Sequence, residues 1–313
     1  MQPEDIENAL VAAGIHPTSV IRVEEVGDGW ECRVFRVGRD GVDDVALRLY
    51  TADPSGGTMR TEVAAYRALE QIEYPAPRLL AQHESRDPLG APFVLIDWLD
   101  GPLADSLGAS HEALDELTGL LVRLHDITPD REAAARHAVA VRTNRDLPAG
   151  RSAALDEGDL DGFRPALQWL AERARDIEAV PLSYVHMDFH PRNVILTRRG
   201  PVVIDWGGFA ITDPRSDLAW SLLLAEAYMG SDTAARILSA YANRRPDGLE
   251  DLSFFRVSAV WRRLATITVM LREGLPPGVK DQVLEGVRLL EPAYRSLTEA
   301  TGTTINEVEG LYT

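Results

Sequence analysis

Three polar side chains in the segments VHMDFHPRNVIL and VVIDW have the residue types and the spacing that phosphoryl transfer requires. Asp188 and Asn193 lie five residues apart, and Asp205 ends the next apolar strand. Pro191 keeps the first segment from being a helix. A carboxylate can orient an attacking hydroxyl group and take its proton, while an amide oxygen and a second carboxylate can hold Mg²⁺ against nucleotide phosphates. The spacing therefore predicts Asp188 as the catalytic base and Asn193 and Asp205 as metal ligands.

Two histidines stand on either side of the predicted base. His186 and His190 are each two residues from Asp188. Because phosphoryl transfer needs no imidazole, we expect both histidines to hydrogen-bond nearby groups and hold the loop in shape. The alternative for the whole segment is that its His, Asp and Asn residues fell into this spacing by chance and only cap turns.

A glycine turn and an upstream ion pair could hold nucleotide phosphates. Gly27 and Gly29 lie between two expected strands, where backbone N–H groups can face an anion and no Cβ blocks its approach. Arg48 lies on a later strand and Glu62 at the start of a helix, the arrangement that holds the α and β phosphates in protein kinases. Two alternatives stay open: a plain β-hairpin, and a surface pair that contributes little stability.

The elements that must position these residues change in kind near residue 100. The expected strands are 20–27, 30–37, 43–50, 77–84 and 91–98, with one helix at 58–71. Beyond a linker near 98–104 the apolar spacing is mostly helical. The expected helices are 110–126, 162–179, 216–228, 232–242, 252–273 and 279–297, and a β-like insert at 184–206 carries the predicted base and metal ligands.

These elements predict an α+β fold with two lobes. Residues 1–98 form a small β-rich lobe that binds a nucleotide, and residues 99–313 form a larger helical lobe with the catalytic loop and the acceptor site. We expect the two lobes to act as one catalytic unit with a ligand in the cleft between them. No internal repeat is present, which excludes solenoid folds.

The chain resembles the aminoglycoside phosphotransferase and choline kinase-like family, which has the protein-kinase-like fold. The resemblance runs from about residue 20 to 275 and depends on the segments GDGWECRVFRV, VALRLY, EVAAYRALE, VHMDFHPRNVIL, VVIDW and DPRSDLAW. It implies that ATP or GTP binds under the turn from Gly27 to Gly29. It also implies that the edge of the nucleotide base lies against the backbone near Ile96 to Trp98.

The same resemblance implies roles for the downstream motifs. Asp188 would be the catalytic base, and Asn193 and Asp205 would bind Mg²⁺, as the spacing alone also predicts. Asp217 in DPRSDLAW is similar to the family's buried aspartate at a helix start, which braces the catalytic loop. The role implied for Asp217 is therefore structural.

One departure from the family concerns Arg48. Many relatives carry a lysine at this position, and Lys280, the only lysine of the chain, lies far away in the sequence. Because Arg is always charged and can bind a phosphate through two hydrogen bonds, we expect it to serve, although its reach and geometry differ. A nucleotide-binding regulator without catalytic activity is the alternative that this substitution leaves open.

The acceptor is expected to be a small hydroxylated molecule. Only GGFAITDPRSDLAW follows Asp205, which leaves no room for the activation segment of protein kinases. The segment ALDEGDLDGF holds Asp156, Glu157, Asp159 and Asp161, and such an acidic loop suits a polycationic aminoglycoside-like antibiotic. A solvated acidic turn is the alternative reading of this segment. Acceptors of the macrolide, peptide-antibiotic, choline or homoserine type also stay open.

Composition argues against several other classes of protein. The chain has 32 basic and 49 acidic side chains and a formal net charge of -17 at pH 7, whereas a nucleic-acid binder needs a positive face. No apolar run approaches the ~20 residues that span a bilayer, and the first residues lack the basic character of a signal peptide. A single cysteine, Cys32, fits a reducing cytoplasm. No obligate protein partner is expected.

Overall fold

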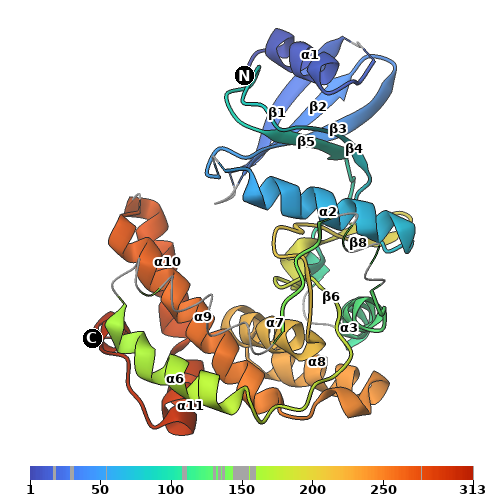
Figure 1. The fold of residues 1–313 in the computed structure, drawn as a ribbon. Coiled ribbons are helices and arrows are strands. Elements are labelled where there is room, and N and C mark those ends of the chain that lie inside the picture. Colours follow the sequence, from blue (N-terminus) through green and yellow to red (C-terminus); the bar gives the residue numbers. More distant parts are fainter. Residues whose placement is uncertain are drawn as a thin grey trace. The chain divides into compact units, whose positions relative to one another are not determined.

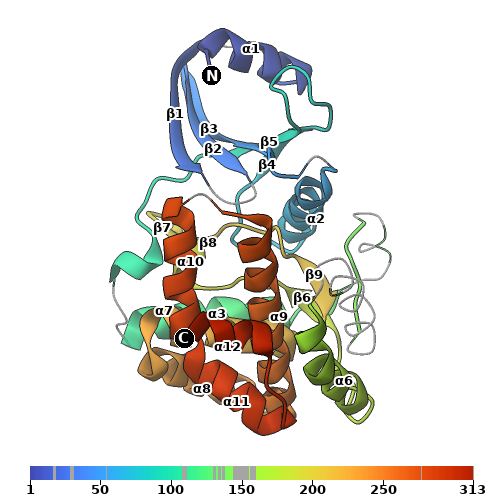
Figure 2. The same cartoon turned by 90° about the vertical axis from the view of Figure 1, so that its left-hand side faces the viewer.

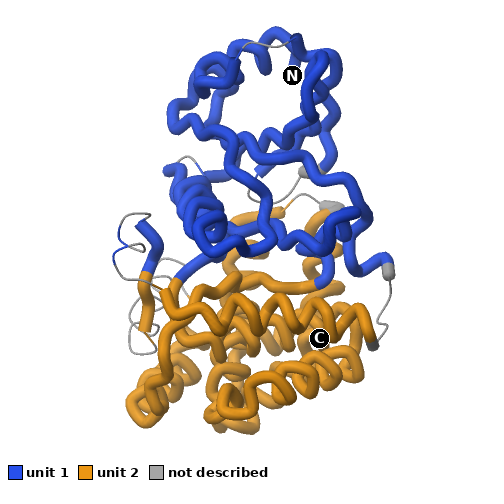
Figure 3. Tube along the Cα trace, turned by 90° about the vertical axis from the view of Figure 1, so that its right-hand side faces the viewer, with its two compact units in different colours: residues 1–106, 130–140, 191–210 blue, residues 107–129, 141–190, 211–313 orange. Residues whose placement is uncertain are grey.

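The computed structural model describes most of the chain as two compact units. The described residues are 1–16, 19–28, 32–53, 55–107, 111–129, 132, 135, 138–143, 155, 160–275 and 277–312. Unit 1 comprises residues 1–106, 130–140 and 191–210, and unit 2 comprises residues 107–129, 141–190 and 211–313 (Figure 3). The units therefore alternate along the sequence, and the functional division expected after residue 98 stays a prediction.

Unit 1 contains a five-stranded antiparallel sheet (Figure 1). Its strands are β1 (Val20–Asp28), β2 (Arg33–Arg39), β3 (Val42–Leu49), β4 (Leu79–His83) and β5 (Phe93–Asp97), in the order β1-β2-β3-β5-β4. The five strands match those expected from the alternating apolar residues. Between β2 and β3 the chain reverses at Gly41, whose φ of +71° is one that glycine adopts without strain.

Two helices cover opposite faces of this sheet (Figure 2). Helix α1 (Pro3–Ala12) buries Ile6 and Leu10 in the same cluster as Leu47 and Phe93. Burial of each such side chain contributes about 1.5–3 kcal/mol. On the other face lies α2 (Gly57–Gln71), which corresponds to the helix expected at 58–71. Helix α1 was not predicted from the sequence.

A short hairpin in unit 1 follows the 3-10 turn η3 (Pro191–Asn193). Strands β7 (Val194–Thr197) and β8 (Gly200–Val203) pair antiparallel, with Val194 opposite Val203. The linker after β5 packs tightly on this hairpin, because a Cβ at Gly101 would lie 2.2 Å from the carbonyl oxygen of Leu196. Only glycine fits this approach, so the linker position is fixed by a residue without a side chain.

Unit 2 is mainly helical. Its elements are α3 (His111–His125), α6 (Arg164–Arg173), β6 (Ser183–Val185), α7 (Pro214–Met229), α8 (Ser231–Arg244), α9 (Leu252–Glu273), α10 (Pro277–Leu289), α11 (Glu291–Thr301) and α12 (Asn306–Tyr312), and β9 (Ala210–Thr212) pairs with β6. The single helix expected at 279–297 was wrong: α10 ends before Leu290, and Pro292 lies in the first turn of α11, where proline is favoured.

Helix α7 lies at the centre of unit 2, since residues on every side of it are buried. It packs against both α8 and α9. Trp261 on α9 donates a hydrogen bond to the carbonyl of Phe163 at 3.0 Å, and the two rings meet edge to face. None of the helices in the described part of the chain is long and apolar enough to cross a membrane. The five-stranded sheet of unit 1 and the helices of unit 2 together give the α+β architecture expected from the sequence.

Candidate active site

Arg48 on β3 and Glu62 on α2 form a buried ion pair in unit 1. Glu62 is 0% exposed and Arg48 is 9% exposed. The Arg48 Nε donates to one carboxylate oxygen at 3.0 Å, and its Nη2 lies 2.9 Å from the other. Burial disfavours the Arg48 cation, but the neighbouring Glu62 carboxylate raises its pKa above the ordinary value. The hydroxyl of Tyr50 donates to the same carboxylate. This pair is therefore not the surface pair that the sequence left as an alternative.

Arg48 also contacts the residue predicted to bind Mg²⁺ after β8. Its Nη2 donates to the Asp205 carboxylate at 3.0 Å. The Asp205 side chain is 43% exposed, so it is accessible to a ligand as well as to Arg48. Asp205 has φ +66°, a left-handed conformation that is uncommon for residues other than glycine and that costs about 1–3 kcal/mol. Such conformations gather at functional sites, where surrounding contacts hold them.

Asn193 and Asp205 lie at one end of the β7–β8 hairpin. Asn193 directly precedes β7, and Asp205 follows β8 by two residues. The backbone N–H of Ile204 donates to the carbonyl of Asn193 at 2.9 Å, which holds the two segments together. One amide oxygen and one carboxylate are hard donors of the kind that Mg²⁺ takes when nucleotide phosphates supply the remaining ligands. The donor set therefore fits Mg²⁺.

The other residues predicted to bind the nucleotide are on the sheet of unit 1. Gly27 pairs with Val34 inside β1, so it continues the strand, and Gly29 lies outside the described residues. Ile96 on β5 is buried, and Trp98 directly follows this strand.

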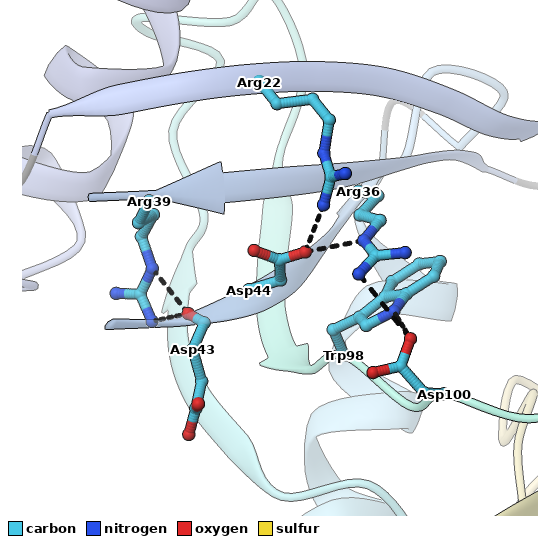
Figure 4. Close-up of polar contacts among 7 residues, drawn as sticks. All are labelled: Arg22, Arg36, Arg39, Asp43, Asp44, Trp98 and Asp100. Carbon is cyan, nitrogen blue, oxygen red and sulfur yellow. Dashed lines mark hydrogen bonds and ion pairs between the residues drawn. The ribbon is translucent and has the colours of Figure 1, made fainter. Parts of the chain in front are cut away.

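The indole of Trp98 is held by charged neighbours on unit 1 (Figure 4). Its Nε1 donates to Asp100 at 2.8 Å, and the Arg36 guanidinium lies 4.6 Å from its ring centre. Arg36 in turn donates to Asp44 at 2.6 Å (Figure 4). These contacts hold the Trp98 side chain, and a nucleotide base against the backbone near Ile96 to Trp98 stays a prediction from the resemblance.

Asp188, the predicted base, belongs to unit 2. Its side chain is 42% exposed, and one carboxylate oxygen accepts a hydrogen bond from Trp220 Nε1 at 3.1 Å. The other oxygen lies 3.6 Å from His190 Nε2. Burial by itself would raise the pKa of Asp188, but His190 and the Trp220 hydrogen bond hold that pKa well below its usual range. The group is therefore an ionised, accessible carboxylate at neutral pH.

The loop that carries Asp188 is braced by Asp217. This carboxylate, which is 0% exposed, accepts hydrogen bonds from the backbone N–H groups of His186 and Met187, both at 2.7 Å. Met187 has φ +64°, so these bonds hold a conformation that the chain would otherwise avoid. His186 is also buried, and its Nδ1 accepts from the backbone N–H of Asp188 at 3.2 Å. The buried side chains of Asp217 and His186 therefore hold the loop in its conformation.

Some of these supporting side chains were not predicted from the sequence. His125, the last residue of α3, lies 3.2 Å from the Asp217 carboxylate through Nε2 and 2.8 Å from the Tyr241 hydroxyl through Nδ1. Trp220 was not among the predicted site residues. A signal for it existed, because Trp220 is three residues after Asp217 on one helix and so shares its face. No local pattern pointed to His125, whose partners are distant in the sequence.

The acidic segment predicted to meet the acceptor is only partly described. Asp156, Glu157 and Asp159 lie outside the described residues. Asp161 begins a 3-10 turn and accepts from Arg164 Nε at 2.7 Å, with its own side chain 78% exposed. The contribution of this segment to acceptor binding stays a prediction.

The chain matches the family model described as the phosphotransferase enzyme family over residues 22–255. The chain belongs to this family. The expected enzyme class, a phosphotransferase with an alcohol group as acceptor, and the expected family resemblance are both confirmed by this match. A search of curated protein sequences finds no match to this phosphotransferase.

Solved structures share the fold of this phosphotransferase at low sequence identity. A candidate aminoglycoside phosphotransferase from Ralstonia eutropha JMP134 has a TM-score of 0.71 and 16% identity, with 96% of this chain and 98% of that chain covered. An ethanolamine kinase from Plasmodium vivax has a TM-score of 0.67 and 13% identity, with 90% and 84% covered. The GDP and kanamycin complex of an APH(2″) enzyme has a TM-score of 0.65 and 17% identity, with 93% and 98% covered. The predicted protein-kinase-like fold is therefore confirmed.

Proposed function

We propose that this phosphotransferase moves the γ-phosphoryl group of ATP or GTP to a hydroxyl group of a small molecule, with Asp188 as the base. The observation that carries the proposal is the state of Asp188: an ionised, accessible carboxylate on a loop that the buried Asp217 holds in a strained conformation. A carboxylate positioned in this way can orient an acceptor hydroxyl group and receive its proton.

The reaction transfers one phosphoryl group. The acceptor oxygen forms a bond to the γ-phosphorus while the bond from that phosphorus to the β–γ bridging oxygen breaks. The hydroxyl proton passes to Asp188, and the nucleoside diphosphate leaves with the bridging oxygen. Asp188 then returns the proton to water, which restores the carboxylate for the next cycle.

The nucleotide phosphates are assigned to unit 1. Arg48 supplies a charge that stays positive at any working pH, and Glu62 holds its guanidinium in place. Asn193 and Asp205 would hold Mg²⁺, which neutralises phosphate charge when it is bound. The ordered pair of Arg48 and Glu62 favours a working kinase over the catalytically silent regulator, whose main support was the missing lysine. The GDP held by the APH(2″) relative supports a nucleotide as the donor.

The acceptor class follows less directly from the described residues. The kanamycin bound by the APH(2″) relative supports an aminoglycoside-like acceptor, and the ethanolamine kinase supports another small alcohol. Of the acidic segment proposed to attract a polycation, only Asp161 is described, and Arg164 already neutralises it. We therefore keep the proposal at a small hydroxylated molecule, with the aminoglycoside-like class as one member.

A nucleoside-diphosphate release assay tests this function. Purified protein is incubated with Mg²⁺ and either ATP or GTP and a panel of aminoglycosides, macrolides, peptide antibiotics, choline and homoserine. Acceptor-dependent release by the wild type, with a product heavier by one phosphoryl group, is the expected result. The Asp188→Asn variant should lack it. If the two proteins released diphosphate at the same rate, the proposed role of Asp188 would be wrong.

A further inference from the structure

An arginine contacts the tryptophan that donates a hydrogen bond to the proposed base. Arg262 on α9 places its guanidinium carbon 4.1 Å from the ring centre of Trp220 on α7. The Nε1 of the same indole donates to the Asp188 carboxylate at 3.1 Å. A guanidinium that lies over an aromatic ring gains a cation–π interaction, which holds it against that ring.

The N–H donors of Arg262 have no hydrogen-bond or ion-pair partner in the part of the chain that the structure describes. Its neighbours on α9 differ in this respect. Arg256 donates to Glu226 at 2.9 Å, and Arg263 donates to the hydroxyl of Tyr228 at 2.8 Å. A partly buried cation loses hydration, and an unpaired one recovers little of that loss inside the protein. No described side chain therefore occupies the N–H donors of Arg262, which can bind an anion.

Two positive and two negative groups lie close enough to Arg262 to shift its pKa. Burial lowers its pKa, and the nearby Arg142 and Arg263 lower it further, whereas Asp188 and Asp217 raise it. Asp217 is occupied by the backbone of the catalytic loop and by His125. The Asp188 carboxylate accepts a hydrogen bond from the Nε1 of the indole whose ring lies against the Arg262 guanidinium. A polycationic acceptor beside Asp188 would meet this arginine and be repelled by it.

We infer that Arg262 binds an oxyanion carried by the acceptor, so that the substrate of this phosphotransferase is a hydroxylated small molecule with a carboxylate or phosphate group. The planar fork of arginine matches both groups through two parallel hydrogen bonds. Trp220 would link recognition to chemistry, because it orients both Arg262 and Asp188. This inference rests on the proposed function, since it places the acceptor beside Asp188.

A site-specific binding experiment tests the inference without relying on turnover. Protein labelled with 5-fluorotryptophan gives a fluorine resonance for each of its six tryptophans, and the Trp220→Phe variant identifies that of Trp220. Inorganic phosphate and acetate serve as the two oxyanion probes, and choline chloride as the cation control, each with Mg·ADP present to saturate the nucleotide site. The matched variants are Arg262→Gln and Arg256→Gln, which remove one arginine each from the same helix.

We expect phosphate and acetate to shift the Trp220 resonance in the wild type and in Arg256→Gln. In Arg262→Gln the dissociation constants should rise about tenfold or more, as expected for loss of a charge-assisted hydrogen bond. No response of Trp220 to either anion, or an equal response in Arg262→Gln, would overturn the inference. A response to phosphate but not to acetate would support a phosphate, and not a carboxylate, as the acceptor group that Arg262 binds.

Kinetics on a matched set of sugars separates the two anionic groups and isolates the proposed function. Glucosamine, glucose, glucuronate and glucose 6-phosphate share most ring hydroxyls and differ in charge. We expect kcat/KM to be higher for an anionic member than for glucose or glucosamine, and Arg262→Gln to raise the KM of that member alone. Preference for glucosamine would overturn the inference. Absence of turnover with every acceptor would count against the proposed function, while the Trp220 resonance still decides the role of Arg262.

Discussion

The guanidinium of Arg48 donates to the Asp205 carboxylate at 3.0 Å while it is also paired with Glu62. One cation therefore joins the consecutive elements β3 and α2 to the end of the β7–β8 hairpin, where Asp205 is 157 residues from Arg48 in the sequence. A lysine, with a single nitrogen, would have to share three donors from one point, whereas the arginine fork presents separate donors to each carboxylate. The arginine at this position thus has a definite geometric result.

Replacement of Arg48 should affect both stability and nucleotide binding. Arg48→Ala leaves the fully buried Glu62 without its cation, and breaking a buried pair in this way costs about 3–5 kcal/mol. The free energy of unfolding, measured by urea denaturation, should fall by this amount. The KM for the nucleotide should rise as well, because the cation proposed to meet its phosphates is gone.

An exposed ion pair on the same sheet provides the control for Arg48. Arg78 pairs with Asp97 at 2.8 Å, but its side chain is 70% exposed. Arg78→Ala should therefore change the free energy of unfolding by less than about 1 kcal/mol. Arg48→Lys should lower the free energy of unfolding by an amount between those of Arg48→Ala and Arg78→Ala, since the charge remains and the fork of two N–H donors is lost. Equal destabilisation by Arg48→Ala and Arg78→Ala would contradict the buried-pair interpretation.

Removal of the Asp205 carboxylate should abolish the Mg²⁺-dependent part of nucleotide binding. Asp205→Ala leaves only the neutral amide oxygen of Asn193 at the end of the hairpin, which offers little to a hard dication. Calorimetric titration with ATP should show tighter binding in the presence of Mg²⁺ for the wild type and no such difference for the variant. Asp40→Ala, which removes an exposed carboxylate from the turn between β2 and β3, should behave as the wild type. Unchanged Mg·ATP affinity in Asp205→Ala would exclude it as a metal ligand.

The sequence predicted those parts of the molecule that depend on local patterns. The five strands of the sheet follow from alternating apolar residues. Asp188 and Asn193 are only five residues apart in the sequence, so both lie on one loop segment. The failures have physical causes too. The prediction of one helix at 279–297 combined α10 and α11, although Pro292 favours the start of a new helix.

Contacts between distant segments could not be predicted in the same way. His125 reaches Asp217 across 92 residues of sequence, and the link from Arg262 through Trp220 to Asp188 joins two helices and a loop. A hydrophobic pattern places an aromatic residue such as Trp220 on a buried face without indicating that its N–H meets a carboxylate. Glu62 is likewise buried because α2 packs on the sheet. The sequence of the helix alone does not indicate whether Glu62 lies in the core or on the surface.

Loss of the Asp188 carboxylate should slow turnover without loss of nucleotide. Asp188→Asn keeps the size of the side chain and can still accept from Trp220, but it cannot take a proton. We expect kcat to fall at least about 10²-fold, the effect typical of a positioned acid or base. Nucleotide affinity, measured by calorimetry on the same preparation, should stay within about twofold, because the phosphates are assigned to unit 1. Retained kcat would remove Asp188 from the base role.

The brace formed by Asp217 should make stability depend on pH in the acid range. Burial raises the pKa of Asp217, but the hydrogen bonds from His125 and from the loop backbone outweigh this and lower it below the ordinary value of 3.8. A carboxyl group with a lowered folded-state pKa stabilises the fold above its ordinary pKa, and that contribution disappears as pH falls through the lowered value. The wild-type free energy of unfolding should therefore decrease as pH drops below about 4.

Asp217→Asn isolates this contribution, since its amide oxygen can still accept one of the two backbone N–H groups while the other is left unpaired. At pH 7 the variant should be less stable than the wild type by about 1–3 kcal/mol, the effect of leaving a buried donor unsatisfied. The difference should narrow as the pH falls below about 4, because Asp217 of the unfolded wild type then takes up a proton and the variant has no carboxyl group at this position. Asp281→Asn, at an exposed site on α10, is the matched control. Its free energy of unfolding should change with pH in the same way as that of the wild type. A constant difference between Asp217→Asn and the wild type over this range would show that Asp217 braces the loop by shape and not by its charge.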